Sequence, residues 1–164
     1  MPLRAAFFDV GNTLVHLRFD RMAEAFAAEG VGREVEALRA AERRARVRLD
    51  PIVAGQGTTE GLDVMRAYLR LILEELGVLW DGRGPRLVER LRALTRVERL
   101  WSEPDPDARA VRGELRRRGL SVGVISNSDG TAEQSLRDAG LLAAVDFVLD
   151  SHLVGVEKPD PRIF

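Results

Sequence analysis

The sequence of 164 residues contains no cysteine, which excludes disulfide bonds, thiolate metal ligands and a cysteine nucleophile together. It has no run of about 18 apolar residues, and its start does not join a charged segment to an apolar one, so neither a membrane span nor a signal peptide is indicated. A formal net charge of -1 leaves no basic surplus for nucleic acid. We therefore expect a cytoplasmic globular protein.

Lysine is almost absent. Of the 25 basic residues only Lys158 is a lysine, and the others are arginines. A lysine carries a compact point charge on a flexible stem, whereas the guanidinium group is planar, so the two are not equivalent at a small charged site. A single lysine can occur anywhere by chance, but the presence of Lys158 among so many arginines favours a small charged site at this residue.

A short apolar run, AAFF at residues 5–8, is followed directly by turn-forming residues. This pattern predicts a strand buried on both faces, with Asp9 at its carboxyl end, where ligands bind in open α/β sheets. A carboxylate there can act as a nucleophile or a metal ligand, and Gly11 and Asn12 can bring backbone amides close to a phosphate. The alternative is an ordinary strand and turn, since Asp, Gly and Asn all favour turns.

Helical periodicity then dominates most of the next ninety or so positions. Four amphipathic helices are predicted, at about residues 19–30, 35–49, 58–76 and 85–100. Asp50 and Pro51 are expected to end the second helix, and Thr58 and Thr59 to cap the third. With no strand among them, these helices predict a small helical bundle inserted after the first strand.

From Trp101 onward the pattern is that of an α/β protein. It predicts a helix through Val111 and Leu115, a strand at residues 120–125, a helix that begins with a capping box from Thr131 to Gln134, a strand at residues 145–149 and a loop at residues 151–161. Strands and helices alternating at this spacing predict parallel pairing with right-handed crossovers.

Polar residues follow each of the three predicted strands. Asp9 follows the first, Ser126 and Asn127 follow the second, and Lys158 lies in the loop after the third. Because the carboxyl ends of parallel strands share one edge of a sheet, these groups can converge into a phosphate site. Taken singly, Ser126 would be a helix cap and Lys158 a solvated loop lysine; their combination favours the site.

Three segments carry a resemblance to a known family. DVGNTL at Asp9, VISNSD at Val124 and VGVEKPDPRIF at Val154 resemble the first three motifs of the haloacid dehalogenase superfamily of hydrolases. The resemblance implies an α/β fold in which a Rossmann-like core, residues 1–15 and 101–164, holds an inserted helical cap domain, residues 16–100. In that superfamily a further strand and an acidic fourth motif follow and complete the metal site. Either the core is part of a longer protein, which is the favoured expectation, or the metal site is incomplete.

The resemblance also implies roles for individual residues. Asp9 would attack phosphorus to form an aspartyl-phosphate, Ser126 would hold a phosphoryl oxygen, and Lys158 would neutralise charge on the nucleophile and the phosphate. Mg²⁺ would bind through the Asp9 carboxylate and the backbone carbonyl of Gly11, as a hard cation on oxygen ligands. The phosphate-binding set would be Gly11, Asn12, Ser126, Asn127 and Lys158.

Gly11 departs from the pattern of the superfamily's phosphatases, which place a second aspartate two residues after the nucleophile. A missing general acid/base costs about 10²- to 10⁴-fold in rate, so acyl or aryl phosphates, whose leaving groups need no proton, would be preferred. Dehalogenases of the superfamily also lack this acid and share the Ser-Asn pair, but typically carry an aromatic residue there. Phosphonate hydrolases need a lysine in the cap, and Lys158 is the sole lysine.

Three functions therefore stay open. The first is a Mg²⁺-dependent phosphohydrolase acting on a small phosphorylated metabolite, the second is a dehalogenase-like hydrolase that forms an ester at Asp9 without metal, and the third is a non-catalytic phosphate- or partner-binding protein. His16 and His152 are interpreted as surface or loop histidines rather than zinc ligands. A homodimer through Leu69 and Leu73 is a further hypothesis.

Overall fold

The computed structural model describes residues 2–56, 61–97 and 100–164. The chain divides into two compact units. The sheet unit comprises Met1–Leu17 and Trp101–Phe164, and the helical unit comprises Arg18–Leu100. No helix within the described ranges has the length and apolar character needed to cross a membrane. Thr58 and Thr59, expected to cap a helix, lie outside the described residues.

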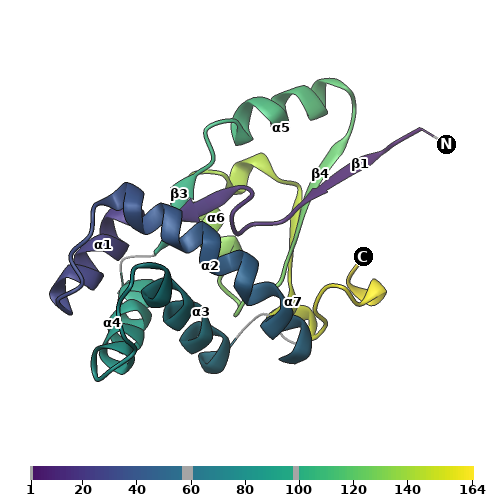
Figure 1. Cartoon of the computed structure of the whole chain (residues 1–164). Helices are drawn as coiled ribbons and strands as arrows, with labels where there is room; N and C mark the ends of the chain where they lie inside the picture. The colour runs from purple at the N-terminus through teal and green to yellow at the C-terminus, as the bar shows by residue number, and fades with distance from the viewer. Residues whose placement is uncertain (1, 57–60, 98–99) are drawn as a thin grey trace. The chain divides into compact units, whose positions relative to one another are not determined.

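The sheet unit is built on a parallel sheet of three strands, as predicted. The strands are β1 (Ala5–Phe8), β4 (Ser121–Ser126) and β5 (Phe147–Asp150), in the order β1-β4-β5. Figure 1 shows purple β1 and green β4 side by side, and their register pairs Phe8 with Val124. The crossovers contain α5 (Ala108–Arg117), α6 (Ala132–Asp138) and the 3-10 turn η1 (Leu142–Ala144).

The third strand begins at Phe147, two residues later than predicted. Asp146 explains the difference, because its Oδ2 accepts the N–H of Val122 at 2.8 Å. The backbone N–H of Asp146 also donates to the Val122 carbonyl at 2.7 Å, and regular strand pairing starts with Gly123 opposite Phe147. The N–H of Val122 and the neighbouring Arg116 guanidinium hold the pKa of Asp146 below its usual range.

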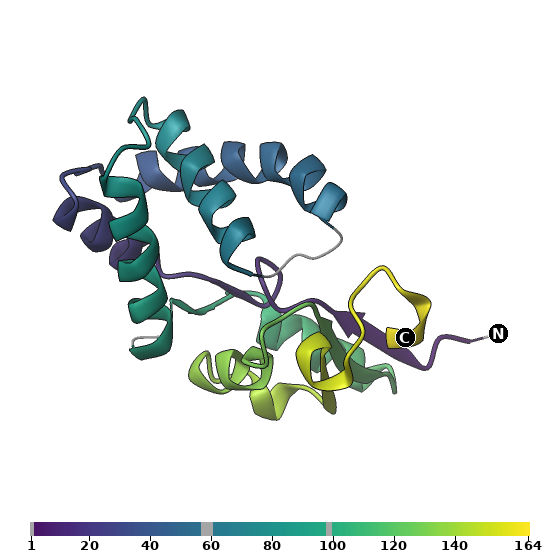
Figure 2. The same cartoon turned by 90° about the horizontal axis from the view of Figure 1, so that it is seen from below.

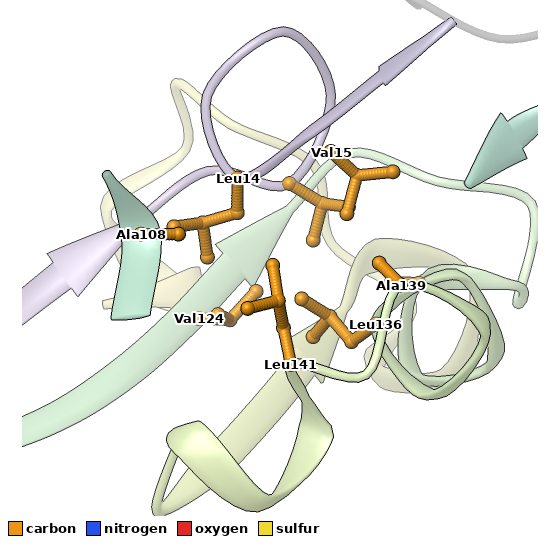
Figure 3. Packing of buried hydrophobic residues seen from close by; sticks show 9 residues of the cluster. Leu14, Val15, Ala108, Val124, Leu136, Ala139 and Leu141 are labelled. Carbon is orange, nitrogen blue, oxygen red and sulfur yellow. The ribbon is translucent and has the colours of Figure 1, made fainter. Parts of the chain in front are cut away.

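The core of the sheet unit lies against the first loop of the chain. Figure 3 shows side chains from this loop and from β4 and α6 directed toward one another. Buried members of the cluster are Val10, Leu14, Val15, Ala108, Val124, Ala132, Leu136, Ala139 and Leu141. Because Val10, Leu14 and Val15 are buried, the core fixes the loop that follows Asp9.

A two-stranded antiparallel sheet was not expected from the sequence. It pairs β2 (Val15–Leu17) with β3 (Trp101–Pro104), and its register shifts between His16 and Leu17. The Nε2 atom of His16 lies 2.9 Å from Asp105 Oδ2. His16 is therefore a partly buried, paired residue, whereas His152 is exposed, as predicted.

The predicted capping box at the start of α6 is wrong. The Thr131 hydroxyl donates to Asp129, not to the helix, and the buried carboxylate of Asp150 at the end of β5 takes the capping role. It accepts the N–H groups of Gly130 and Ala132 at 3.1 Å each and that of His152 at 3.0 Å. The segment after Asp150, expected to be a loop, begins with a short helix, α7 (Ser151–Val154), and ends in a 3-10 turn, η2 (Pro161–Ile163).

The helical unit contains the four predicted helices, which Figure 2 shows from below. They are α1 (Phe19–Ala28), α2 (Val35–Gln56), α3 (Leu62–Glu75) and α4 (Arg83–Val97). Contrary to expectation, α2 continues through Pro51. Proline removes one backbone hydrogen bond, but α2 is held along α3 by ion pairs from Arg44 and Arg48 to Glu75, at 2.7 and 2.8 Å.

Two leucines of α3 were expected to face a dimer partner, and this is wrong. Leu69 and Leu73 are 1% and 0% exposed within the helical unit itself. Nearby, the Tyr68 hydroxyl donates to Glu42 at 2.9 Å, and burial together with the Glu42 charge raises the pKa of Tyr68 well above its usual value. These side chains stabilise the packing of α2 on α3.

Candidate active site

Asp9 lies directly after β1, at the carboxyl edge of the parallel sheet. Its Oδ1 atom accepts the N–H of Val10 at 2.8 Å and lies 3.1 Å from the ammonium nitrogen of Lys158. The side chain is 45% exposed. Within the described ranges no protein group bonds Oδ2. Asp9 therefore has one oxygen held by two donors and the other open to a ligand.

Lys158 is hydrogen-bonded to residues at the end of β4. Its ammonium group donates to the backbone oxygen of Ile125 at 2.9 Å, and its side chain is 24% exposed. The carboxamide of Asn127 binds both backbone groups of Lys158, accepting its N–H at 2.7 Å and donating to its carbonyl oxygen at 3.0 Å. The loop after β5 thus places the ammonium group of the one lysine next to Asp9, the candidate nucleophile.

Ser126 lies at the edge of the sheet near Asp9, as predicted, whereas the Asn127 side chain is bonded to Lys158. Ser126 ends β4 next to the end of β1, because the register pairs Phe8 with Val124. Its side chain is 3% exposed, and its hydroxyl donates to the Asn127 carbonyl at 3.3 Å. The Asn127 carboxamide, expected on a phosphate, makes one hydrogen bond through its nitrogen and one through its oxygen to Lys158.

The loop after Asp9 closes tightly on itself. The Val10 carbonyl accepts the N–H groups of Leu14 at 2.9 Å and Val15 at 3.0 Å, and the N–H of Asn12 donates to the Val15 carbonyl at 2.8 Å. Asn12 adopts a left-handed conformation with φ of 56°, which asparagine tolerates better than most residues. The Asn12 amide, expected to approach a phosphate, is therefore used within the loop.

Gly11 is different, because neither its N–H nor its carbonyl is hydrogen-bonded to any residue that the structure describes. Its carbonyl and the Asp9 carboxylate supply two hard oxygen donors. Mg²⁺ usually keeps several waters and binds through one or two carboxylates, so this donor set fits a water-rich magnesium site. No cluster of three or more acidic or histidine residues able to hold a metal occurs in the described ranges.

The sequence pattern did not reveal two residues beside the site. The indole of Trp101, from β3, lies over Gly11, and a Cβ atom on Gly11 would be 3.6 Å from Cζ3 of that ring. Asp150 orders the loop between β4 and α6 through the N–H groups of Gly130 and Ala132. An aspartate directly after the apolar run FVL is a signal that could have singled out Asp150, whereas the partner of Trp101 lies too far away in the sequence to be deduced.

At the carboxyl edge of a parallel sheet, where ligands bind in α/β folds, the structure holds an aspartate that is paired with a lysine and can act as a nucleophile. Residues 3–164 match the family model of haloacid dehalogenase-like hydrolases. The chain belongs to this family of hydrolases, which confirms the resemblance drawn from the three motifs.

Curated relatives extend the comparison. The chain is 33% identical over 171 residues to human haloacid dehalogenase-like hydrolase domain-containing protein 3, covering 100% of this chain and 67% of the relative. It is 34% identical over 116 residues to a phosphoserine phosphatase of Thermus thermophilus, covering 65% and 45%. The chain thus spans about two thirds of the length of the first relative.

Solved structures share the fold. An L-2-haloacid dehalogenase from Xanthobacter autotrophicus aligns with a TM-score of 0.62 and 26% identity, covering 99% of this chain and 62% of that one. YfnB of Bacillus subtilis, a HAD-hydrolase described as bound to magnesium, aligns with a TM-score of 0.67 over 100% of this chain and 70% of that one. At 18% identity the YfnB likeness shows the fold alone.

Proposed function

We propose that the chain is the catalytic core of a Mg²⁺-dependent phosphohydrolase that acts on a small phosphorylated metabolite through Asp9. The proposal is carried by the difference in bonding between the two oxygens of the Asp9 carboxylate. Oδ1 is held by Lys158 and by the N–H of Val10, while Oδ2 has no partner among the described residues. A carboxylate oriented in this way is suited to nucleophilic attack.

In the proposed reaction Oδ2 of Asp9 forms a bond to phosphorus as the bond from phosphorus to the leaving oxygen breaks. Water then attacks phosphorus of the aspartyl-phosphate, which releases inorganic phosphate and restores the carboxylate. The Lys158 ammonium, 3.1 Å from Oδ1, stabilises the negative charge that gathers between nucleophile and phosphoryl group. The Ser126 hydroxyl, now bonded to the Asn127 carbonyl, can turn to a phosphoryl oxygen.

Asp9 and the Gly11 carbonyl would hold Mg²⁺, which when bound supplies charge neutralisation for the phosphoryl oxygens. The helical unit, Arg18–Leu100, would serve as the cap that selects the substrate. Because Gly11 offers no acid to protonate a leaving alcohol, acyl and aryl phosphates are the favoured substrate class. The phosphoserine phosphatase of T. thermophilus, 34% identical over 116 residues, supports phosphate ester chemistry.

A second candidate, a metal-independent dehalogenase-like hydrolase, is favoured by a specific observation. The Trp101 indole lies against Gly11, so an aromatic ring stands beside the position where dehalogenases of the superfamily typically carry one. The L-2-haloacid dehalogenase of X. autotrophicus, 26% identical, has the same fold. In this reaction Oδ2 of Asp9 would displace halide from carbon, and water would hydrolyse the ester.

The deciding experiment measures hydrolysis of an aryl phosphate by the full-length protein with and without Mg²⁺, beside Asp9→Asn. Turnover that requires both the metal and Asp9 supports the phosphohydrolase. Asp129→Asn is the matched control, because it makes the same substitution at an exposed residue of the loop after β4. Halide release from a 2-haloacid without metal would establish the second candidate, and phosphate binding without turnover the non-catalytic alternative.

A further inference from the structure

The two hydrogen bonds from Asn127 to Lys158 join segments that are far apart in the sequence. Asn127 follows β4, and Lys158 follows β5 and α7, so the chain between them makes a complete crossover. Both bonds reach backbone atoms of one residue, at 2.7 Å to its N–H and 3.0 Å to its carbonyl oxygen. A carboxamide that satisfies both groups of one residue fixes the position and the direction of its backbone.

A third hydrogen bond joins the side-chain ammonium of Lys158 to the end of β4. The Lys158 ammonium donates to the Ile125 carbonyl at 2.9 Å. Lys158 is thus held at its backbone and at its tip by residues 125–127, while its ammonium lies 3.1 Å from Asp9 at the end of β1. The distance between nucleophile and ammonium therefore depends on these bonds.

We propose that Asn127 is a positioning residue that holds Lys158 in register with Asp9, and does not itself bind substrate. Its carboxamide oxygen and nitrogen each make one hydrogen bond to the Lys158 backbone, and these are its side-chain bonds among the described residues. A lysine side chain can adopt many rotamers, so a fixed backbone limits the positions that the ammonium can reach. The effect of Asn127 on the rate of catalysis rests on the proposed function, whereas its effect on the position of the Lys158 ammonium does not.

The single lysine makes the structural consequence directly measurable. Selective ¹³C,¹⁵N-lysine labelling gives one lysine side-chain NMR signal, that of Lys158. In the parent protein we expect Asp9→Asn to shift this signal, because the ammonium loses its carboxylate. In the Asn127→Ala background the same Asp9→Asn change should shift the signal by less than half as much. An undiminished shift would overturn the proposal.

Two further variants keep the experiment decisive. Asn127→Asp retains an acceptor for the Lys158 N–H and loses the donor to its carbonyl, so an intermediate response is expected even where Asn127→Ala folds poorly. Ser128→Ala is the control, because it truncates the neighbouring residue, which makes hydrogen bonds to other described residues through its backbone groups and not through its side chain. It should leave the response of Lys158 to Asp9→Asn intact.

Kinetics separate positioning from substrate binding. A misplacement of about 1 Å costs roughly 10²-fold in rate, so Asn127→Ala should lower kcat on an aryl phosphate by about that factor with KM little changed, and Asn127→Asp should lower it less. A raised KM with unchanged kcat and an unmoved lysine signal would show a substrate contact and overturn the proposal. If the parent protein has no turnover, the phosphohydrolase fails alone and the NMR comparison still decides the role of Asn127.

Discussion

Gly11 and Trp101 approach each other without crowding. A Cβ atom on Gly11 would lie 3.6 Å from Cζ3 and 3.8 Å from Cη2 of the indole, which are ordinary van der Waals distances. Gly11 is not among the glycines with positive φ, so an L side chain meets no backbone strain there. The absence of an acid at this position is therefore a chemical feature of the site that a substitution can reverse.

Gly11→Asp should raise turnover of alkyl phosphates. The introduced carboxyl would lie two residues after the nucleophile and against an apolar ring, which favours its protonated form and hence proton donation to a leaving alcohol. Since general acid catalysis contributes about 10²- to 10⁴-fold, we expect a gain of at least 10-fold on an alkyl phosphate and little change on an aryl phosphate. The measurement is kcat/KM on the two substrates.

Gly11→Ala is the control for that experiment, because it adds the Cβ atom without the carboxyl. It should leave both rates close to those of the parent. A folded Gly11→Asp protein whose alkyl phosphatase activity equals that of Gly11→Ala would show that position 11 does not reach the leaving group.

Lys158→Arg should lower kcat in spite of the conserved charge. The single nitrogen of the ammonium contacts two oxygens, Asp9 Oδ1 at 3.1 Å and the Ile125 carbonyl at 2.9 Å. A planar guanidinium cannot reproduce both contacts, and loss of one charge-stabilising donor costs about 10²- to 10³-fold. Steady-state kinetics on an aryl phosphate measure the loss, with the exposed change Arg162→Lys expected to have no effect.

The sequence predicted the parts of the fold that depend on local pattern. Apolar runs indicated β1 and β4, but the prediction that β1 is buried on both faces is wrong, because β1 is an edge strand of the described sheet and Phe7 is 52% exposed. Amphipathic spacing indicated the four helices of the helical unit. Parallel pairing then followed from the order of the elements. The convergence of Asp9 and Lys158 could be predicted for the same reason, since residues that follow parallel strands share one edge of the sheet.

The features that the sequence did not reveal depend on partners distant in the chain. The strands β2 and β3 are three and four residues long, too short for a periodic signal, and the residues of the helical unit separate them in the sequence. Thr131 satisfied the local rule for a helix cap, but Asp150 at the end of β5 supplied the acceptors. Asn127 was assigned to phosphate because its position suggested the site, whereas its bonds to Lys158 required the folded loop.

Asp150→Asn should destabilise the sheet unit. The carboxylate is 3% exposed and accepts three N–H groups, from Gly130, Ala132 and His152. An amide turns one acceptor into a donor that faces other donors, and an unsatisfied buried group costs about 1–3 kcal/mol. Urea denaturation at neutral pH should show a loss of this size, while Asp129→Asn, exposed in the same loop, should change the free energy of unfolding by no more than about 0.5 kcal/mol.

The pair formed by His16 and Asp105 should make stability depend on pH in the acid range. The hydrogen bond from the His16 ring, at 2.9 Å, and then the N–H of Asp107, at 3.0 Å, hold the pKa of Asp105 below its usual value. A carboxyl whose pKa is lower in the folded than in the unfolded chain contributes stability that is present above the unfolded pKa of about 3.9 and is lost as pH falls through the folded pKa. The side chains are 30% and 28% exposed, so the contribution of the pair is limited.

Asp105→Asn should therefore lower the free energy of unfolding by up to about 1 kcal/mol at pH 6 and by less at pH 3. Urea denaturation of both proteins between pH 3 and pH 7 measures the difference. The His16→Gln background provides the control, because it removes the largest cause of the lowered pKa, and there the effect of Asp105→Asn should vary less with pH. A cost of Asp105→Asn that is the same at every pH would mean that Asp105 contributes only as a neutral hydrogen-bond acceptor, since only the charged form of the carboxyl links stability to proton binding.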